Sequence, residues 1–269
     1  MKRNEIHILL QTIEQTLFRE KTQDIGLISG KMSAVIFYFH YARFTGDISF
    51  RDIANELLDE IQNQLVNCTE KSYRHGIAGI GIAFDYLIEN GFIEAEEDFL
   101  DDVDKALYVA FMNQPGTGFS LYDGLTGYAW YWLCRINRPY SEMLLSEILF
   151  ILQNNLSQMS STELFDVHNF LFEINCMPVF GQKKENFLRS FRKQYLLKAS
   201  ESYPRLINSP AGEQVRQHLL RRYWQIDSNI PVSPIIKEVK LDGSTNLAWE
   251  GLYLISVLSP KEKSWVGLL

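Results

Sequence analysis

The chain has 269 residues, of which 46% are hydrophobic, and its formal net charge is −7. It can bury a large core as one domain or two packed halves, and its acidic balance argues against a nucleic-acid partner. Its 3 cysteines are widely spaced, which argues against a disulfide framework and for a reducing compartment. Because no apolar run approaches the roughly 18–20 residues of a membrane span, we expect a cytoplasmic protein.

Apolar segments that begin with a pair of small residues recur along the chain. The paired positions are Gly30 and Ser33, Gly76 and Gly79, Gly124 and Gly127, and Ala248 and Gly251. The first three pairs begin at residues 30, 76 and 124, so the steps between them are 46 and 48 residues. Such a period in a helical pattern indicates stacked helix pairs.

The glycines in these segments need a physical reason, because interior glycine costs a helix about 1 kcal/mol relative to alanine. We predict that the missing side chains let backbones and neighbouring loops approach the head of each helix closely. The free N–H groups of the first turn would then face a central cavity.

Amphipathic helices are predicted between these segments, over residues 51–67, 96–112 and 141–156. Each has one apolar stripe and is covered on one side only, whereas the glycine-headed helices are apolar almost all round and need packing on both sides. Two concentric rings of helices satisfy this demand. The sequence therefore predicts an all-α fold, an α/α toroid that forms a single domain over residues 1–269, with clear repeats at 26–135 and 247–258.

The pattern is weaker after residue 156. Residues 163–180 are predicted to form a degenerate inner helix, and residues 184–201 and 213–226 form amphipathic patterns. Two prolines and alternating apolar residues predict an extended connection or a short hairpin over residues 228–245.

Three stretches carry a family resemblance: "GLISGKMSAVIFYFHYARFTGD", "HGIAGIGIAFDYL" and "YDGLTGYAWYWL". They resemble lanthionine synthetase C-like proteins over residues 26–135, and the resemblance returns at 247–258. It implies an α/α toroid whose inner helices begin with Gly-x-x-Gly motifs. In the cyclase members, two cysteines and a histidine hold a zinc ion that activates a peptide cysteine thiol. The thiolate then adds to a dehydrated serine or threonine and closes a thioether ring.

The zinc-ligand motifs of that family are missing from this chain. The family places its ligands in Cys-x-Gly and Cys-His-Gly motifs at the heads of late inner helices, where this chain has Trp249 and Glu250. Cys176 has no adjacent histidine or glycine. We therefore predict that the protein has no metal site, needs no cofactor and does not close thioether rings by the family's mechanism.

A histidine does match the family's acid/base position, because His75 precedes Gly76 in a His-Gly-x-x-Gly motif. A histidine at the head of an inner helix can shuttle a proton near pH 7. Asp123 is the candidate for the family's aspartate, although its spacing and order differ from the cyclase pattern. Two simpler interpretations stay open: Asp123 as the N-cap of the helix that begins near Gly124, and His75 as an ordinary loop residue.

Residues beside the helix heads are the candidates for ligand binding: Arg74, Tyr122, Trp249 and Glu250. A toroid brings the heads of its inner helices to one end of its axis. We therefore expect His75, Asp123 and Glu250 to line one cavity mouth that binds a ligand, most plausibly a peptide.

Three functions are compatible with the sequence. The first is a zinc-free peptide-binding or accessory factor in the maturation of a ribosomally made peptide, with a peptide substrate or a modification enzyme as its partner. The second is a metal-free acid/base enzyme that uses His75 and an acidic residue. The third, supported by fold analogy alone, is a carbohydrate-active enzyme with Asp123 and Glu250 as paired carboxylates.

Overall fold

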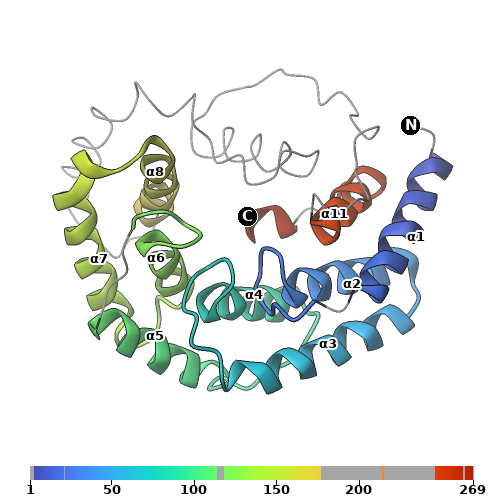
Figure 1. The fold of residues 1–269 in the computed structure, drawn as a ribbon, viewed down its shortest axis with the longest axis horizontal. Helices are drawn as coiled ribbons and strands as arrows, with labels where there is room; N and C mark the ends of the chain where they lie inside the picture. The colour runs from blue at the N-terminus through green and yellow to red at the C-terminus, as the bar shows by residue number, and fades with distance from the viewer. Residues whose placement is uncertain are drawn as a thin grey trace. The chain divides into compact units, whose positions relative to one another are not determined.

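The computed structural model describes residues 3–20, 22–113, 118–176, 214, 246–262 and 264–268. All elements in these ranges are helices, and no strand occurs among them (Figure 1). The all-α prediction is therefore confirmed for the described part of the chain. Except for Gln214, the predicted helices at 184–201 and 213–226 and the hairpin at 228–245 lie outside the described residues. No helix within the described ranges is long and apolar enough to cross a membrane.

The chain divides into two compact units. Unit 1 contains residues 1–70, 86–95 and 205–269, and unit 2 contains residues 71–85 and 96–204. Helix α4 (Ile77–Glu89) contributes its first residues to unit 2 and its last residues to unit 1. The ring closure of a toroid stays a prediction.

Unit 1 is built around a helix that is buried on all sides. It contains α1 (Arg3–Arg19), α2 (Lys31–Thr45), α3 (Ser49–Leu65), α11 (Leu247–Leu258) and the short 3₁₀ helix η4 (Ser264–Leu268). Helix α2 packs against α3 and α11, and α11 also packs against α1. Most side chains of α2 and α11 are buried, whereas α3 buries one stripe that includes Ala54, Leu58 and Ile61.

Unit 2 repeats this division between two kinds of helix. It contains α5 (Asp101–Asn113), α6 (Leu125–Cys134), α7 (Ser141–Asn155), the 3₁₀ helix η1 (Leu156–Gln158) and α8 (Ser161–Cys176). Helix α6 is buried almost all round and packs against α7 and α8 (Figure 1). In α4, Ile80 and Phe84 are buried, as predicted for a glycine-headed helix. The alternation of all-round buried helices with one-sided helices is therefore confirmed.

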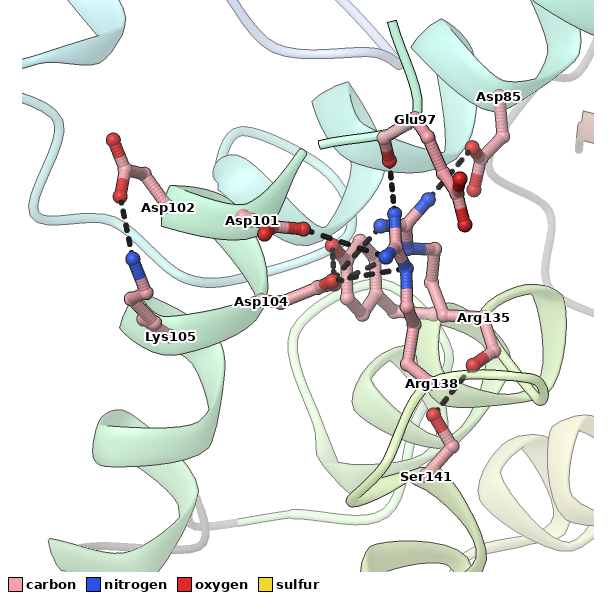
Figure 2. Close-up of polar contacts among 10 residues, drawn as sticks. Asp85, Glu97, Asp101, Asp102, Asp104, Lys105, Arg135, Arg138 and Ser141 are labelled. Atoms are coloured by element: carbon pink, nitrogen blue, oxygen red, sulfur yellow. Dashed lines mark hydrogen bonds and ion pairs between the residues drawn. The ribbon is translucent and has the colours of Figure 1, made fainter. Parts of the chain in front are cut away.

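A network of charged side chains joins α4, α5 and α6 within unit 2. Arg135, just after α6, lies 2.8 Å from Asp104 of α5 and 3.3 Å from Asp85 of α4. The Tyr131 hydroxyl donates to the same Asp104 carboxylate, and Arg138 lies 3.7 Å from it. Figure 2 shows both guanidinium groups turned toward Asp104. Because Arg135 and Asp104 are mostly buried and paired with each other, this network is structural and holds the outer helix α5 against its neighbours.

Candidate functional site

The head of α6 is formed by a loop that folds back tightly on itself. The N–H of Leu125 donates to the carbonyl of Gly118 at 2.9 Å, and the N-cap residue Gly124 has an extended backbone. A Cβ at Gly124 would lie 2.7 Å from the Gly118 carbonyl oxygen, and a Cβ at Gly127 would lie 2.4 Å from that of Leu121. Both positions need glycine because backbone passes too close for a side chain. The predicted reason for the glycines is confirmed at this helix head.

The N–H groups of the first helical turns are less available than expected. The N–H of Leu125 is used by the loop itself. At the head of α11, the side-chain oxygen of Asn246 accepts the N–H groups of Ala248 and Trp249 at 3.0 and 3.3 Å. These three N–H groups bond within the chain and are therefore not free to face a cavity.

Arg74, Tyr122 and Asp123 meet where the loop before α4 touches the loop before α6. We call these residues the Arg74 cluster. The backbone N–H of Arg74 donates to the Tyr122 carbonyl at 3.0 Å, and Arg74 Nε lies 3.4 Å from Asp123 Oδ1. The guanidinium also lies 5.2 Å from the centre of the Tyr122 ring. The side chains of Arg74 and Asp123 are 27% and 60% exposed, so the Asp123 carboxylate faces solvent, whereas Arg74 Nε and Tyr122 are buried.

His75 and Asp123 flank this cluster in different ways. His75 is exposed in the turn before α4, and its backbone N–H donates to Ser72 Oγ at 3.2 Å. Asp123 does not cap α6, because the N-cap is Gly124 and no side chain bonds to the first turn. The N-cap interpretation of Asp123 is therefore wrong, and its carboxylate pairs with Arg74 instead.

Trp249 and Glu250 lie in a different environment. Both side chains are fully buried at the head of α11 in unit 1, whereas the Arg74 cluster belongs to unit 2. The indole N–H of Trp249 donates to the carbonyl of Ile28 at 2.8 Å, and its ring lies 6.1 Å from that of Trp265. This environment is typical of packing residues. A cavity mouth shared by His75, Asp123 and Glu250 stays a prediction.

Two acidic residues of α8 that were not among the predicted site residues hold the loop that carries Tyr122 and Asp123. Glu163 Oε2 accepts the backbone N–H of Ser160 at 2.9 Å, and the N–H of Glu163 bonds to Ser160 Oγ at 3.3 Å. This reciprocal pair is a capping box that fixes the start of α8. The other oxygen of Glu163 accepts the N–H of Phe119 at 2.9 Å.

Asp166 continues this contact along the loop, because Asp166 Oδ2 accepts the N–H of Leu121 at 2.8 Å. The side chain is buried, and burial raises its pKa to about 7; repulsion by Glu163 adds to the rise, whereas the hydrogen bond from Leu121 opposes it. The Ser-x-x-Glu spacing at 160–163, followed by an aspartate on the same helix face, is the sequence signal that could have found both acids.

The residues in the described ranges do not fit the family's zinc site. Those ranges contain no group of His, Cys, Asp or Glu side chains placed to hold a metal ion. Cys134 is exposed at the C-terminal end of α6, and Cys68 follows the end of α3 with its thiol 3.6 Å from the Glu70 carbonyl. Neither cysteine lies at the head of a buried helix, and the side chain of Cys176 lies outside the described residues. Trp249 and Glu250 stand at the head of α11 in the described chain, and an indole is not a zinc ligand.

The comparison with protein families gives a match that covers the Arg74 cluster. The family profile described as lanthionine synthetase C-like protein matches residues 21–171, which is more than half of the chain. The match includes the Arg74 cluster, His75 and both acids of α8. No curated protein matches the chain at a significant level.

Proposed function

Since the chain belongs to the lanthionine synthetase C-like family, we propose that it binds a peptide at the Arg74 cluster and acts without zinc during maturation of a ribosomally made peptide. Its direct partner is the peptide itself or the enzyme that modifies it.

The observation that carries the proposal is the ion pair between half-buried Arg74 and exposed Asp123 beside the head of α6. Arg74 offers N–H donors to peptide carbonyl or carboxylate oxygens, and Asp123 offers acceptor oxygens to peptide N–H groups or to a basic side chain. A pair with one exposed partner contributes modestly to stability, because solvent screens the charge of Asp123. A ligand group can therefore replace either partner of the pair at a small cost in free energy.

The zinc-free part of the proposal is supported by the positions of the donors. The family's zinc chemistry requires thiolates beside a histidine at helix heads, and this chain places Trp249 and Glu250 at the late motif. No step of the proposed activity passes through a metal.

A metal-free acid/base activity is a second candidate, and the exposure of His75 favours it. His75 stands beside Arg74 in the matched His-Gly-x-x-Gly motif, where its imidazole can reach solvent and a bound peptide. A carbohydrate-active function has less support, because Glu250 is fully buried and cannot contact a sugar without rearrangement.

Peptide binding can be tested by fluorescence anisotropy with zinc-stripped protein and pools of short fluorescein-labelled peptides rich in Ser, Thr and Cys. We expect binding by the wild-type protein and at least about tenfold weaker binding by Arg74→Ala, which corresponds to about 1.4 kcal/mol. Lys105→Ala is the matched control, because Lys105 is an exposed cation of unit 2 whose side chain is 76% accessible and pairs only with Asp102 among the described residues. It should bind like the wild type.

The proposal is wrong if the stripped protein binds no pool and zinc restores binding, or if Arg74→Ala and Lys105→Ala behave alike. Turnover separates the two candidates: a product that His75→Ala fails to form, at unchanged peptide affinity, would identify an enzyme.

A further inference from the structure

The loop before α6 is held from one side by α8. Two of its backbone groups bond to α8: the N–H of Phe119 donates to Glu163, and the N–H of Leu121 donates to Asp166. Within the same segment, the carbonyl of Phe119 accepts the hydroxyl of Thr126 from α6 at 2.6 Å. Tyr122 and Asp123 follow directly. The position of two members of the Arg74 cluster therefore depends on a pair of carboxyl groups from another helix.

The two carboxyl groups differ in their electrostatic surroundings. Burial alone would raise the pKa of Glu163, but the hydrogen bonds from Phe119 and Ser160 outweigh it and hold the pKa below its ordinary value. Asp166 is almost fully covered and has one N–H donor, and its pKa is about 7. The titratable groups that interact electrostatically with it are Glu163 from α8 and Tyr122 from the loop. Tyr122 in turn interacts with the charges of Arg74 and Asp123.

We propose that Asp166 is a positioning residue for the Arg74 cluster: it holds residues 118–124 against α8 while it is protonated, and its ionisation loosens them. The consequence for ligand binding rests on the proposed function, but the movement of the loop does not. The pH-dependent step is thus local opening of residues 118–124 near neutral pH.

The direction of the pH effect follows from the linkage between loop opening and the ionisation of Asp166. When the loop lifts away, water reaches Asp166 and its pKa falls toward the ordinary value of 3.8. A group whose pKa is higher in the closed form favours closure at low pH and loses that effect as the pH rises. The equilibrium constant for opening should therefore increase by up to about tenfold per pH unit between pH 5 and 7 and level off above about 7.

Hydrogen exchange of the full-length protein, followed by mass spectrometry of peptides that contain Leu121, tests this proposal without any ligand. Rates are measured from pH 5 to 8.5 and corrected for intrinsic chemical exchange. We expect the protection of this segment to fall as the pH rises toward 7 in the wild-type protein. Asp166→Asn keeps an oxygen acceptor for Leu121 but cannot ionise, so its profile should be flat.

Glu163→Gln is the matched control, because it keeps its acceptor for Phe119 and adds no group that titrates near neutrality. It should keep the pH dependence, with the plateau moved to a lower pH since the repulsion from Glu163 is gone. Peptides from α3 in unit 1 report any global loss of structure in the variants. A flat wild-type profile, or a pH dependence that survives in Asp166→Asn, would overturn the proposal. If Arg74→Ala loses peptide binding but keeps the pH dependence of hydrogen exchange, both proposals stand. If the wild-type protein shows the pH dependence but binds no peptide, only the proposed function is rejected.

Discussion

The loops that lead into α2 and α6 have the same backbone turn but are held in place by different chemistry. The N–H of Lys31 donates to the Asp24 carbonyl at 2.8 Å, and the N–H of Leu125 donates to the Gly118 carbonyl at 2.9 Å. In both hydrogen bonds the donor lies seven residues after the acceptor and directly follows a glycine N-cap with an extended backbone. The turn itself is therefore a repeated unit of the fold.

The contacts from neighbouring helices are of opposite polarity. In the α2 loop, the carbonyl of Ile28 accepts the indole N–H of Trp249 at 2.8 Å and the amide of Asn246 at 2.7 Å. In the α6 loop, the N–H of Leu121 donates to the carboxyl of Asp166. From the neighbouring elements, neutral donors hold the first loop and an ionisable acceptor holds the second. Within the first loop, the carboxylate of Asp24 also accepts the N–H of Gly26 and the hydroxyl of Ser29. The comparison teaches that one repeated turn can be fixed from a neighbouring element by neutral donors in unit 1 and by a buried carboxyl group in unit 2.

The largest expected effect tests the shared turn. Gly30→Ala and Gly124→Ala should each destabilise the protein by about 3 kcal/mol or more, because backbone cannot easily move aside. The added Cβ atoms would lie 2.3 Å from Gly26 N and 2.6 Å from Ser120 N. Gly118→Ala is the control and should cost no more than about 1 kcal/mol, since its nearest neighbour is a side-chain oxygen at 3.6 Å. Chemical denaturation measures all three, and equal losses would remove the reason given for the glycines.

The next effect tests the ionisable contact by its pH dependence. The pKa of Asp166 is raised from 3.8 to about 7, so its favourable contribution is complete below pH 4 and is lost as the pH rises through 7. Asp166→Asn should therefore increase the free energy of unfolding at pH 8 relative to the wild type, by on the order of 2 kcal/mol, and the gain should vanish near pH 4. Denaturation curves at both pH values provide the measurement. A variant that is less stable than the wild type at pH 8 would contradict the assignment.

The neutral contact in unit 1 should respond to substitution but not to pH. Trp249→Phe removes the N–H that bonds to Ile28 and should cost about 1–2 kcal/mol at every pH between 5 and 8. Trp265→Phe is the matched control: the ring is fully buried, and its N–H has no hydrogen-bond partner within the described part of the chain. The control should cost less than Trp249→Phe, and the opposite order would show that the Ile28 contact does not hold the loop.

The smallest expected effect concerns the capping box. Glu163→Ala removes the acceptor for Ser160 and Phe119 and should cost about 1 kcal/mol, with faster hydrogen exchange at the start of α8 and in the loop before α6. Glu147→Ala on the exposed face of α7 is the control and should be nearly neutral. If exchange increases only in α8, Glu163 caps the helix without holding the loop.

The helices could be predicted from the sequence because the number and spacing of their apolar residues indicate how much of each helix is buried. Helix α2 and helix α6 are packed on all sides, so nearly every position is apolar, and the spacing of their glycine heads shows the repeat. Arg74, Tyr122 and Asp123 were chosen from the sequence because they stand beside the heads of α4 and α6, and their role in ligand binding stays a prediction. Where Asp123 would point was not predicted, because an N-cap and an ion pair need the same kind of residue before a helix.

Contacts between distant segments could not be predicted from local patterns. Asp166 lies 45 residues from Leu121, and Trp249 lies 221 residues from Ile28. No local pattern shows which backbone group a buried side chain will meet. Trp249 and Glu250 were chosen as ligand-binding residues by their place in the motif, and only the folded chain shows that both are fully buried.

Photo-crosslinking tests the central proposal most directly. A peptide pool rich in Ser, Thr and Cys, with a photoreactive group on each peptide, is bound to the zinc-stripped full-length protein, and the crosslinked residues are found by mass spectrometry. We predict that the crosslinks fall on the loop around Arg74 and His75 and on residues 118–124, and that Arg74→Ala reduces them while Lys105→Ala does not. Crosslinks confined to unit 1, or crosslinks that form only after zinc is added, would contradict the proposal.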